Sequence, residues 1–158
     1  MSELLDDEDI EDEVSDMGSL NHSLTAGRIA GLLFNDERFE VMPELSLDGS
    51  QIELIPNLAV YTEPSPQASP MDDVLMVSQM PDLIIEVLSP KQRISDIFAK
   101  FKAYFALGVK SCWLALPLIE VIDVYSQPDQ HRTFDLNDSE VIDEVMDIHL
   151  PIAKVFGR

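Results

Sequence analysis

The residues best placed for chemistry lie between Pro81 and Gly108, where one acidic residue stands in an apolar segment and lysines follow it. Residues 82–88 read DLIIEVL, and their apolar side chains fall on both sides of an extended chain. That pattern is typical of a strand covered on both faces, as in parallel sheets. Glu86 lies within it, and burying an unpaired carboxylate is costly. Glu86 therefore either faces a lysine, an arginine or a metal ion, or stands at an open strand end and reaches solvent or one lysine.

A basic helix is predicted directly after this strand. Pro90 stops the strand because proline cannot continue the hydrogen-bond ladder. The apolar side chains of residues 94–105 then recur at helical spacing. Lys100 and Lys102 lie on opposite borders of the apolar stripe, and either stem could run along the core and bring its ammonium to Glu86. The spacing alone does not choose between the two lysines.

Two further polar residues lie on strands predicted before this segment. Residues 39–47 and 51–61 have strand patterns, and the Asp-Gly-Ser between them is a strong hairpin signal. Glu44 stands on the first strand and Asn57 on the second. The amide of Asn57 is either part of a site or an ordinary strand-end amide with its hydrogen bonds satisfied.

Charge is distributed unevenly along the chain. The net charge of this acidic protein is −20, and no lysine or arginine precedes Arg28. Such a balance argues against broad nonspecific affinity for nucleic acid, which depends on Lys and Arg. Residues 1–17 are predicted to be a disordered acidic tail, which gives solubility or shields the basic helix. Residues 18–158 are predicted to be one domain.

Compartment and membrane association can be predicted from the same composition. The chain has one cysteine, Cys112, which excludes an internal disulfide and fits a reducing compartment. No secretory signal is visible, and the apolar runs are too short to cross a bilayer. We therefore expect a cytoplasmic protein with no membrane partner and a buried, structural thiol.

The remaining elements are expected to complete a mixed fold. A first helix is predicted up to Phe34, with Ser19 or Asn21 as its cap. Residues 62–80 read as a long proline-containing loop, and residues 151–156 as a final helical turn. Further strands are predicted at residues 111–116, 120–125 and 132–136. An exposed edge at Val121 to Tyr125 could pair two copies into a homodimer.

The order of these segments resembles a known family. The segments ELSL, PNLAVY, PDLIIEVLSP and AKFKAYFALGVKSCWL, preceded by a helix, are similar to a large bacterial family of putative restriction endonucleases that is expanded in cyanobacteria. That family belongs to the PD-(D/E)XK nuclease superfamily, and the resemblance covers Asn21 to the C-terminus. It implies an α/β (α+β) fold, with a restriction-endonuclease-like mixed β-sheet flanked by helices.

The resemblance also implies a catalytic site. The second acid of the family falls on Glu86, and its lysine, which members commonly draw from the following helix, falls on Lys100. The first acid, an Asp, falls on Asn57, which is a departure from the pattern. Asp82 cannot replace it, because four strand residues separate it from Glu86 by about 13 Å, whereas oxygen ligands lie ~2.1 Å from one Mg²⁺. Glu44 could lend a carboxylate to the metal.

Three functions follow from this sequence. The first is a Mg²⁺-dependent (or Mn²⁺-dependent) endonuclease that hydrolyses DNA, with Glu86, Asn57 and Glu44 on the metal and Lys100 at the attacking water. Asn57 would weaken this activity, because its amide lacks the charge that holds a hard cation. The second is a catalytically inactive nuclease-fold module for binding or assembly. The third is an acidic protein that mimics nucleic acid and occupies a basic partner.

Overall fold

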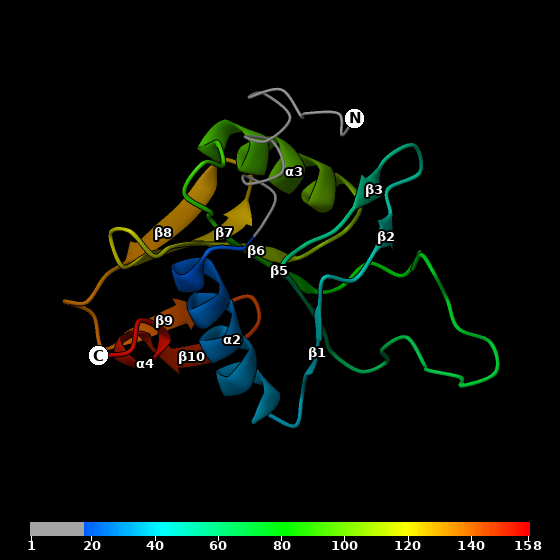
Figure 1. Ribbon diagram of the computed structural model, residues 1–158, viewed down its shortest axis with the longest axis horizontal. Coiled ribbons are helices and arrows are strands. Elements are labelled where there is room, and N and C mark those ends of the chain that lie inside the picture. Colours follow the sequence, from blue (N-terminus) through cyan, green and yellow to red (C-terminus); the bar gives the residue numbers. More distant parts are fainter. Residues whose placement is uncertain (1–17) are drawn as a thin grey trace, which may run out of the picture.

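A six-stranded mixed sheet forms the centre of the computed structural model, which describes residues 18–158 (Figure 1). The strands lie in the order β1-β4-β5-β6-β7-β8. The β5–β6 pair is parallel and the other neighbours are antiparallel. The bounds are β1 (Glu40–Pro43), β4 (Leu58–Tyr61), β5 (Leu83–Val87), β6 (Ser111–Leu116), β7 (Val121–Gln127) and β8 (Gln130–Phe134). The predicted fold class is confirmed, whereas the predicted acidic tail, residues 1–17, lies outside the described residues.

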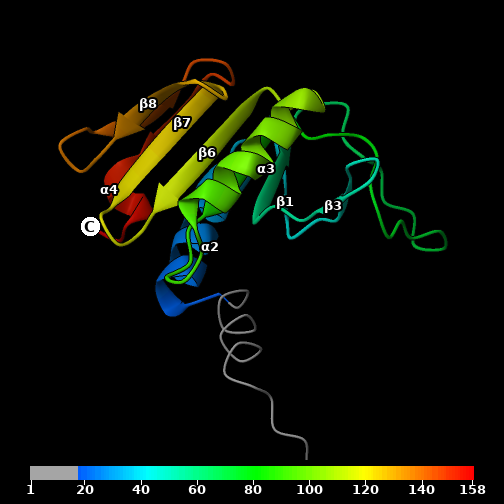
Figure 2. The same cartoon turned by 90° about the horizontal axis from the view of Figure 1, so that it is seen from above.

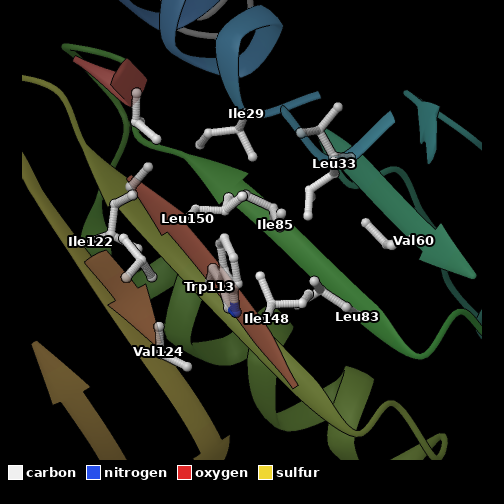
Figure 3. Packing of buried hydrophobic residues seen from close by; sticks show 14 of the residues in the cluster. Ile29, Leu33, Val60, Leu83, Ile85, Trp113, Ile122, Val124, Ile148 and Leu150 are labelled. Atoms are coloured by element: carbon white, nitrogen blue, oxygen red, sulfur yellow. The ribbon is translucent and has the colours of Figure 1, made fainter. Parts of the chain in front are cut away.

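Helices cover both faces of this sheet (Figure 2). One face is covered by α2 (Leu20–Phe34), and Figure 3 shows Ile29 and Leu33 of this helix above the strand residue Ile85. The other face is covered by α3 (Ile94–Ala106), which buries Phe101 and Tyr104 in a second cluster. Side chains of β5 alternate between the two clusters, so both of its faces are buried. This confirms the reading of residues 82–88 as a doubly covered strand.

Two small sheets complete the structure. The Asp-Gly-Ser turn joins β2 (Leu47–Asp48) to β3 (Glu53–Leu54), as the hairpin signal predicts. The long hairpin is interrupted, however, since β1 and β4 pair in the main sheet while β2 and β3 pair outside it. The second small sheet pairs β9 (Glu140–Asp143) with β10 (Ile148–Pro151) and packs on the α2 side beside α4 (Ile152–Val155).

The segment between β5 and α3 turns as the sequence predicts. Ser89 accepts a hydrogen bond from the backbone N–H of Gln92 at 3.0 Å, and α3 then begins at Ile94. The helix ends beside Gly108, which has a φ of +103°. Such a backbone conformation is strained for residues with a Cβ, so glycine suits this position.

The predicted dimer edge is wrong. Val121 to Tyr125 belong to β7, which pairs with β6 on one side and β8 on the other. The strand that forms the edge of the sheet is β8, residues 130–134. A homodimer therefore cannot form through β7 in the way that the alternating pattern suggested.

In residues 18–158, no helix is both long enough and apolar enough to cross a bilayer.

Candidate functional site

Glu86 is a buried carboxyl group on β5. It is 2% exposed, and its Oε1 accepts a hydrogen bond from the Tyr104 hydroxyl of α3 at 3.3 Å. Burial raises the pKa of Glu86 to about 7, although the charge of Lys100, the Tyr104 hydroxyl and the Asn57 backbone act to lower it. The group therefore does not stand at an open strand end in solvent. It can hold or release a proton close to neutral pH.

The structure brings Lys100 rather than Lys102 to this carboxyl group. Lys100 is half-buried, and its charge stabilises ionised Glu86 through space without a hydrogen bond between them. Lys102 is exposed and is not among the groups that shift the pKa of Glu86. Helical spacing did not show which lysine lies near Glu86, and the orientation of α3 on the sheet shows that it is Lys100.

Asn57 lies opposite Glu86 at the end of β4. Leu58 pairs with Ile85, so the residue before Leu58 faces the residue after Ile85. The Asn57 side chain turns into the sheet, where its Oδ1 accepts the backbone N–H of Val87 at 2.7 Å. It thereby replaces a ladder bond just before the first residue of β4. Asn57 is thus both a strand-end amide whose oxygen is hydrogen-bonded and a neighbour of the buried acid.

Glu44 lies next to Asn57 across the β1–β4 pair. Its backbone N–H donates to the Asn57 carbonyl oxygen at 3.1 Å, so the hairpin register does bring these two residues together. The Glu44 side chain is exposed, and its backbone has a φ of +52°. The two residues line a cavity of about 290 Å³ beneath α2.

Asp82 lies at the far end of β5 and serves a structural purpose. Its carboxylate accepts two hydrogen bonds from Thr62, each of 2.8 Å, and forms a 3.1 Å ion pair with Lys110. Burial acts to raise the pKa of Asp82, but these contacts outweigh burial and lower it. Asp82 therefore anchors β5 away from the site, as the distance along the strand predicts.

The donors at this site do not form a magnesium site as they stand. Within residues 18–158, no three side chains of His, Cys, Asp and Glu gather into a group that could hold a metal ion. Glu86 is one carboxylate with a raised pKa, and the Asn57 oxygen is already engaged by a backbone N–H. Magnesium is usually bound by one or two ionised carboxylates together with several waters. This donor set is therefore short of the oxygens and charge that a divalent cation requires.

Sequence reasoning missed two residues here. Tyr104 follows Lys100 by four positions, so both lie on one face of α3, and that spacing could have identified it. His22 of α2 lines the cavity that contains Asn57 and Glu44. No spacing signal links His22 to the site, because the packing of α2 on the sheet brings it there.

Comparison with known proteins agrees with this fold. Residues 2–153 match a family described as "Uma2: Putative restriction endonuclease". A crystal structure of a putative nuclease belonging to DUF820 from Anabaena variabilis is similar, with a TM-score of 0.75 and 20% sequence identity. The similarity covers 90% of this chain and 84% of that one. At this identity the likeness shows the fold alone, and no curated protein matches the chain.

Proposed function

We propose that this chain, which belongs to the Uma2 family of putative restriction endonucleases, is an attenuated metal-dependent DNA endonuclease. One observation supports the proposal above all. Glu86 of β5, Lys100 of α3 and Asn57 before β4 come from three separate elements and meet at one end of the sheet. The family pattern expects two acids and a lysine for phosphodiester hydrolysis. This chain has one of the acids and the lysine, and the amide of Asn57 stands in place of the other acid.

Each residue has a role in this proposal. Glu86 supplies the one buried carboxylate, and Lys100 offsets negative charge on the phosphate. Asn57 supplies no charge, and its oxygen is held by Val87. The Mg²⁺ or Mn²⁺ expected from the family therefore binds weakly, and hydrolysis is slow for that reason.

An Asn57→Asp variant isolates this cause. Aspartate has the same shape, so one carboxylate oxygen can keep the Val87 hydrogen bond while the other replaces the amide NH₂. Two adjacent carboxyl groups repel each other when ionised, and a cation relieves the repulsion. We expect the variant to be less stable than the wild type without metal, and its melting temperature to rise when Mg²⁺ or Mn²⁺ is added.

The experiment is cleavage of supercoiled plasmid with Mg²⁺ or Mn²⁺. Asn57→Asp should cleave at least about tenfold faster than the wild type, since one added ligand charge stabilises the metal complex. Glu86→Gln should abolish cleavage in both backgrounds, and Asn137→Asp, in an exposed turn, controls for the added charge. An Asn57→Asp protein with no metal-dependent stabilisation and no cleavage would refute the proposal.

A second candidate is the catalytically inactive nuclease-fold module. The Asn57 hydrogen bond to Val87 favours it, because the side chain is used to complete the sheet. This candidate predicts that the wild type cleaves no DNA at any metal concentration, whereas the attenuated enzyme cleaves slowly at high Mn²⁺.

A further inference from the structure

An apolar groove lies where the parallel strands β5 and β6 end, and it is lined by the first turns of α2 and α3. Its volume is about 300 Å³, and its walls include Ser19, Leu88, Pro90, Ile94, Leu118 and Ile119. Three of these side chains are large, apolar and in contact with water, since Leu118 is 94% exposed, Ile119 62% and Ile94 41%. Exposed apolar surface that gathers in one groove marks a binding site.

The rim of this groove on the α3 side carries positive charge. Lys91 and Arg93 lie in the turn between two lining residues, and both are exposed. In the described part of the chain, neither side chain forms an ion pair. Asp96 is the only acid in α3 and the turn before it. Glu120, directly after the lining turn of β6, is already paired with Arg158. The groove therefore suits a ligand that has apolar side chains beside acids.

The chain itself contains a segment of this chemistry. Residues 4–9 read LLDDED, in which two leucines are followed by four acids, and we call them the LLDDED segment. They lie outside the described residues, which begin at Gly18, next to Ser19 in the groove wall. Leu5 and Ser19 are fourteen positions apart, and a chain of that length spans at most about 50 Å. The groove is therefore within reach, and tethering gives the segment an effective concentration on the order of millimolar.

We propose that the LLDDED segment binds in the apolar groove of its own molecule. Leu4 and Leu5 cover the exposed apolar side chains of the groove, and residues 6–9 lie beside Lys91 and Arg93. Burial of the leucines is the main attraction, because ion pairs between exposed groups contribute little. The docked acids also lower the positive potential beyond the end of β5, which weakens the binding of any polyanion there. This inference goes beyond the proposed function and holds whether or not the protein cleaves DNA.

The test uses full-length ¹⁵N-labelled protein that carries a nitroxide spin label on Ser2→Cys. The native thiol of Cys112 is fully buried, and burial raises its pKa, so it does not compete for the label. The NMR signals to follow are the backbone amides of Leu118 and Ile119 in the groove. Lys110, at the opposite end of β6, is the reference. We expect the label to broaden the two groove signals more strongly than the reference signal.

Variants distinguish docking from the mere proximity of a tethered label. Replacing both Leu4 and Leu5 by serine should lower the docking equilibrium constant at least about tenfold, because buried apolar area is lost. Ile10→Ser should change it little, since Ile10 is a single apolar residue between two acids. Leu118→Ser should also lower it about tenfold, and this change spares the fold because Leu118 is 94% exposed.

Charge is tested separately from apolar contact. Lys91→Glu should lower the docking equilibrium constant about threefold, as expected for an ion pair between exposed groups. Lys154→Glu is the matched control, because Lys154 is an exposed lysine of α4 that does not line the groove. It should leave the broadening of the groove signals unchanged.

Two results would overturn the inference. The first is equal broadening with and without Leu4 and Leu5, because proximity alone would then account for it. The second is broadening of the groove signals when ¹⁵N-labelled wild type is mixed with spin-labelled protein of natural isotope abundance, because the segment would then occupy a second copy. Broadening that requires the leucines and is absent from the mixture would support it. None of these readouts involves cleavage, so failure of the inference and failure of the endonuclease proposal are distinguishable.

Discussion

Replacing Glu86 by glutamine should make the protein more stable at alkaline pH. The carboxyl group is buried on β5, and its closest hydrogen-bond donor among side chains is the Tyr104 hydroxyl at 3.3 Å. The charge of Lys100 favours ionised Glu86 through space, and hydrogen bonds from Tyr104 and the Asn57 backbone add to it, but burial outweighs all three. Glutamine has nearly the same shape and carries no charge, so Glu86→Gln removes the cost of a buried carboxylate and retains an oxygen for Tyr104.

The size of the effect follows from the pKa of Glu86. Folding raises it from 4.5 to about 7, chiefly through burial. Below pH 4.5 the group is protonated in both states, so its contribution to stability is fully retained. As the pH rises to about 7, Glu86 ionises in the unfolded chain before it ionises in the folded protein, so the free energy of unfolding decreases. Each pKa unit corresponds to about 1.4 kcal/mol, so the whole loss is about 3 kcal/mol.

The assay is urea unfolding of wild type and Glu86→Gln between pH 5 and pH 8, followed by fluorescence. Trp113 is the only tryptophan and is fully buried, so its emission reports unfolding. The two proteins should differ little at the acidic end and by about 3 kcal/mol at pH 8, with glutamine the more stable. Glu53→Gln, at an exposed position, controls for the loss of one negative charge. A stability difference that stays constant across this range would refute the reasoning.

Three other predictions concern neighbouring features. Lys100→Gln should raise the pKa of Glu86 further because a compensating charge is lost, whereas Lys102→Gln should leave it unchanged; ¹³C NMR of the carboxyl signal checks both. Asp143→Ala should destabilise the fold by about 3 kcal/mol or more, measured by urea unfolding, because Asp143 is buried and accepts hydrogen bonds from three donors. Gly27→Ala should raise the melting temperature, with a gain of about 0.5–1 kcal/mol, because a Cβ there meets no atom within 4 Å.

The strands and helices around Glu86 are predictable from sequence because their packing is periodic. Both faces of β5 are apolar, so Leu83–Val87 could be identified as a doubly covered strand. The apolar stripe of residues 94–105 likewise predicts a helix, and the structure has α3 at Ile94–Ala106. The alternating pattern of Val121 to Tyr125 predicts an edge strand, which is wrong because an interior strand also alternates when one of its faces carries a polar cluster. Asp123 supplies such a cluster, accepting hydrogen bonds from Tyr125 and Thr133.

The arrangement of side chains at the site could not be predicted from periodicity, because it depends on tertiary packing and strand register. Lys100 and Lys102 lie on opposite borders of the apolar stripe, and only the packing of α3 shows which of them is near Glu86. The hydrogen bond of Asn57 depends on where β4 begins relative to β5, which is a matter of register between distant segments. The placement of His22 depends on how α2 lies across the sheet. Residue types and the family pattern identified the acid, the amine and the amide, whereas the packing determined which of their atoms remain available.

The hydrogen bond between Asn57 and Val87 also bears on how such a gene can change. Asparagine and aspartate codons differ at a single base, and both side chains offer the oxygen that this backbone N–H requires. One point mutation can therefore exchange the two residues while the strand end keeps its support. The support of the strand end therefore does not itself prevent the exchange of an amide for a carboxylate at this position.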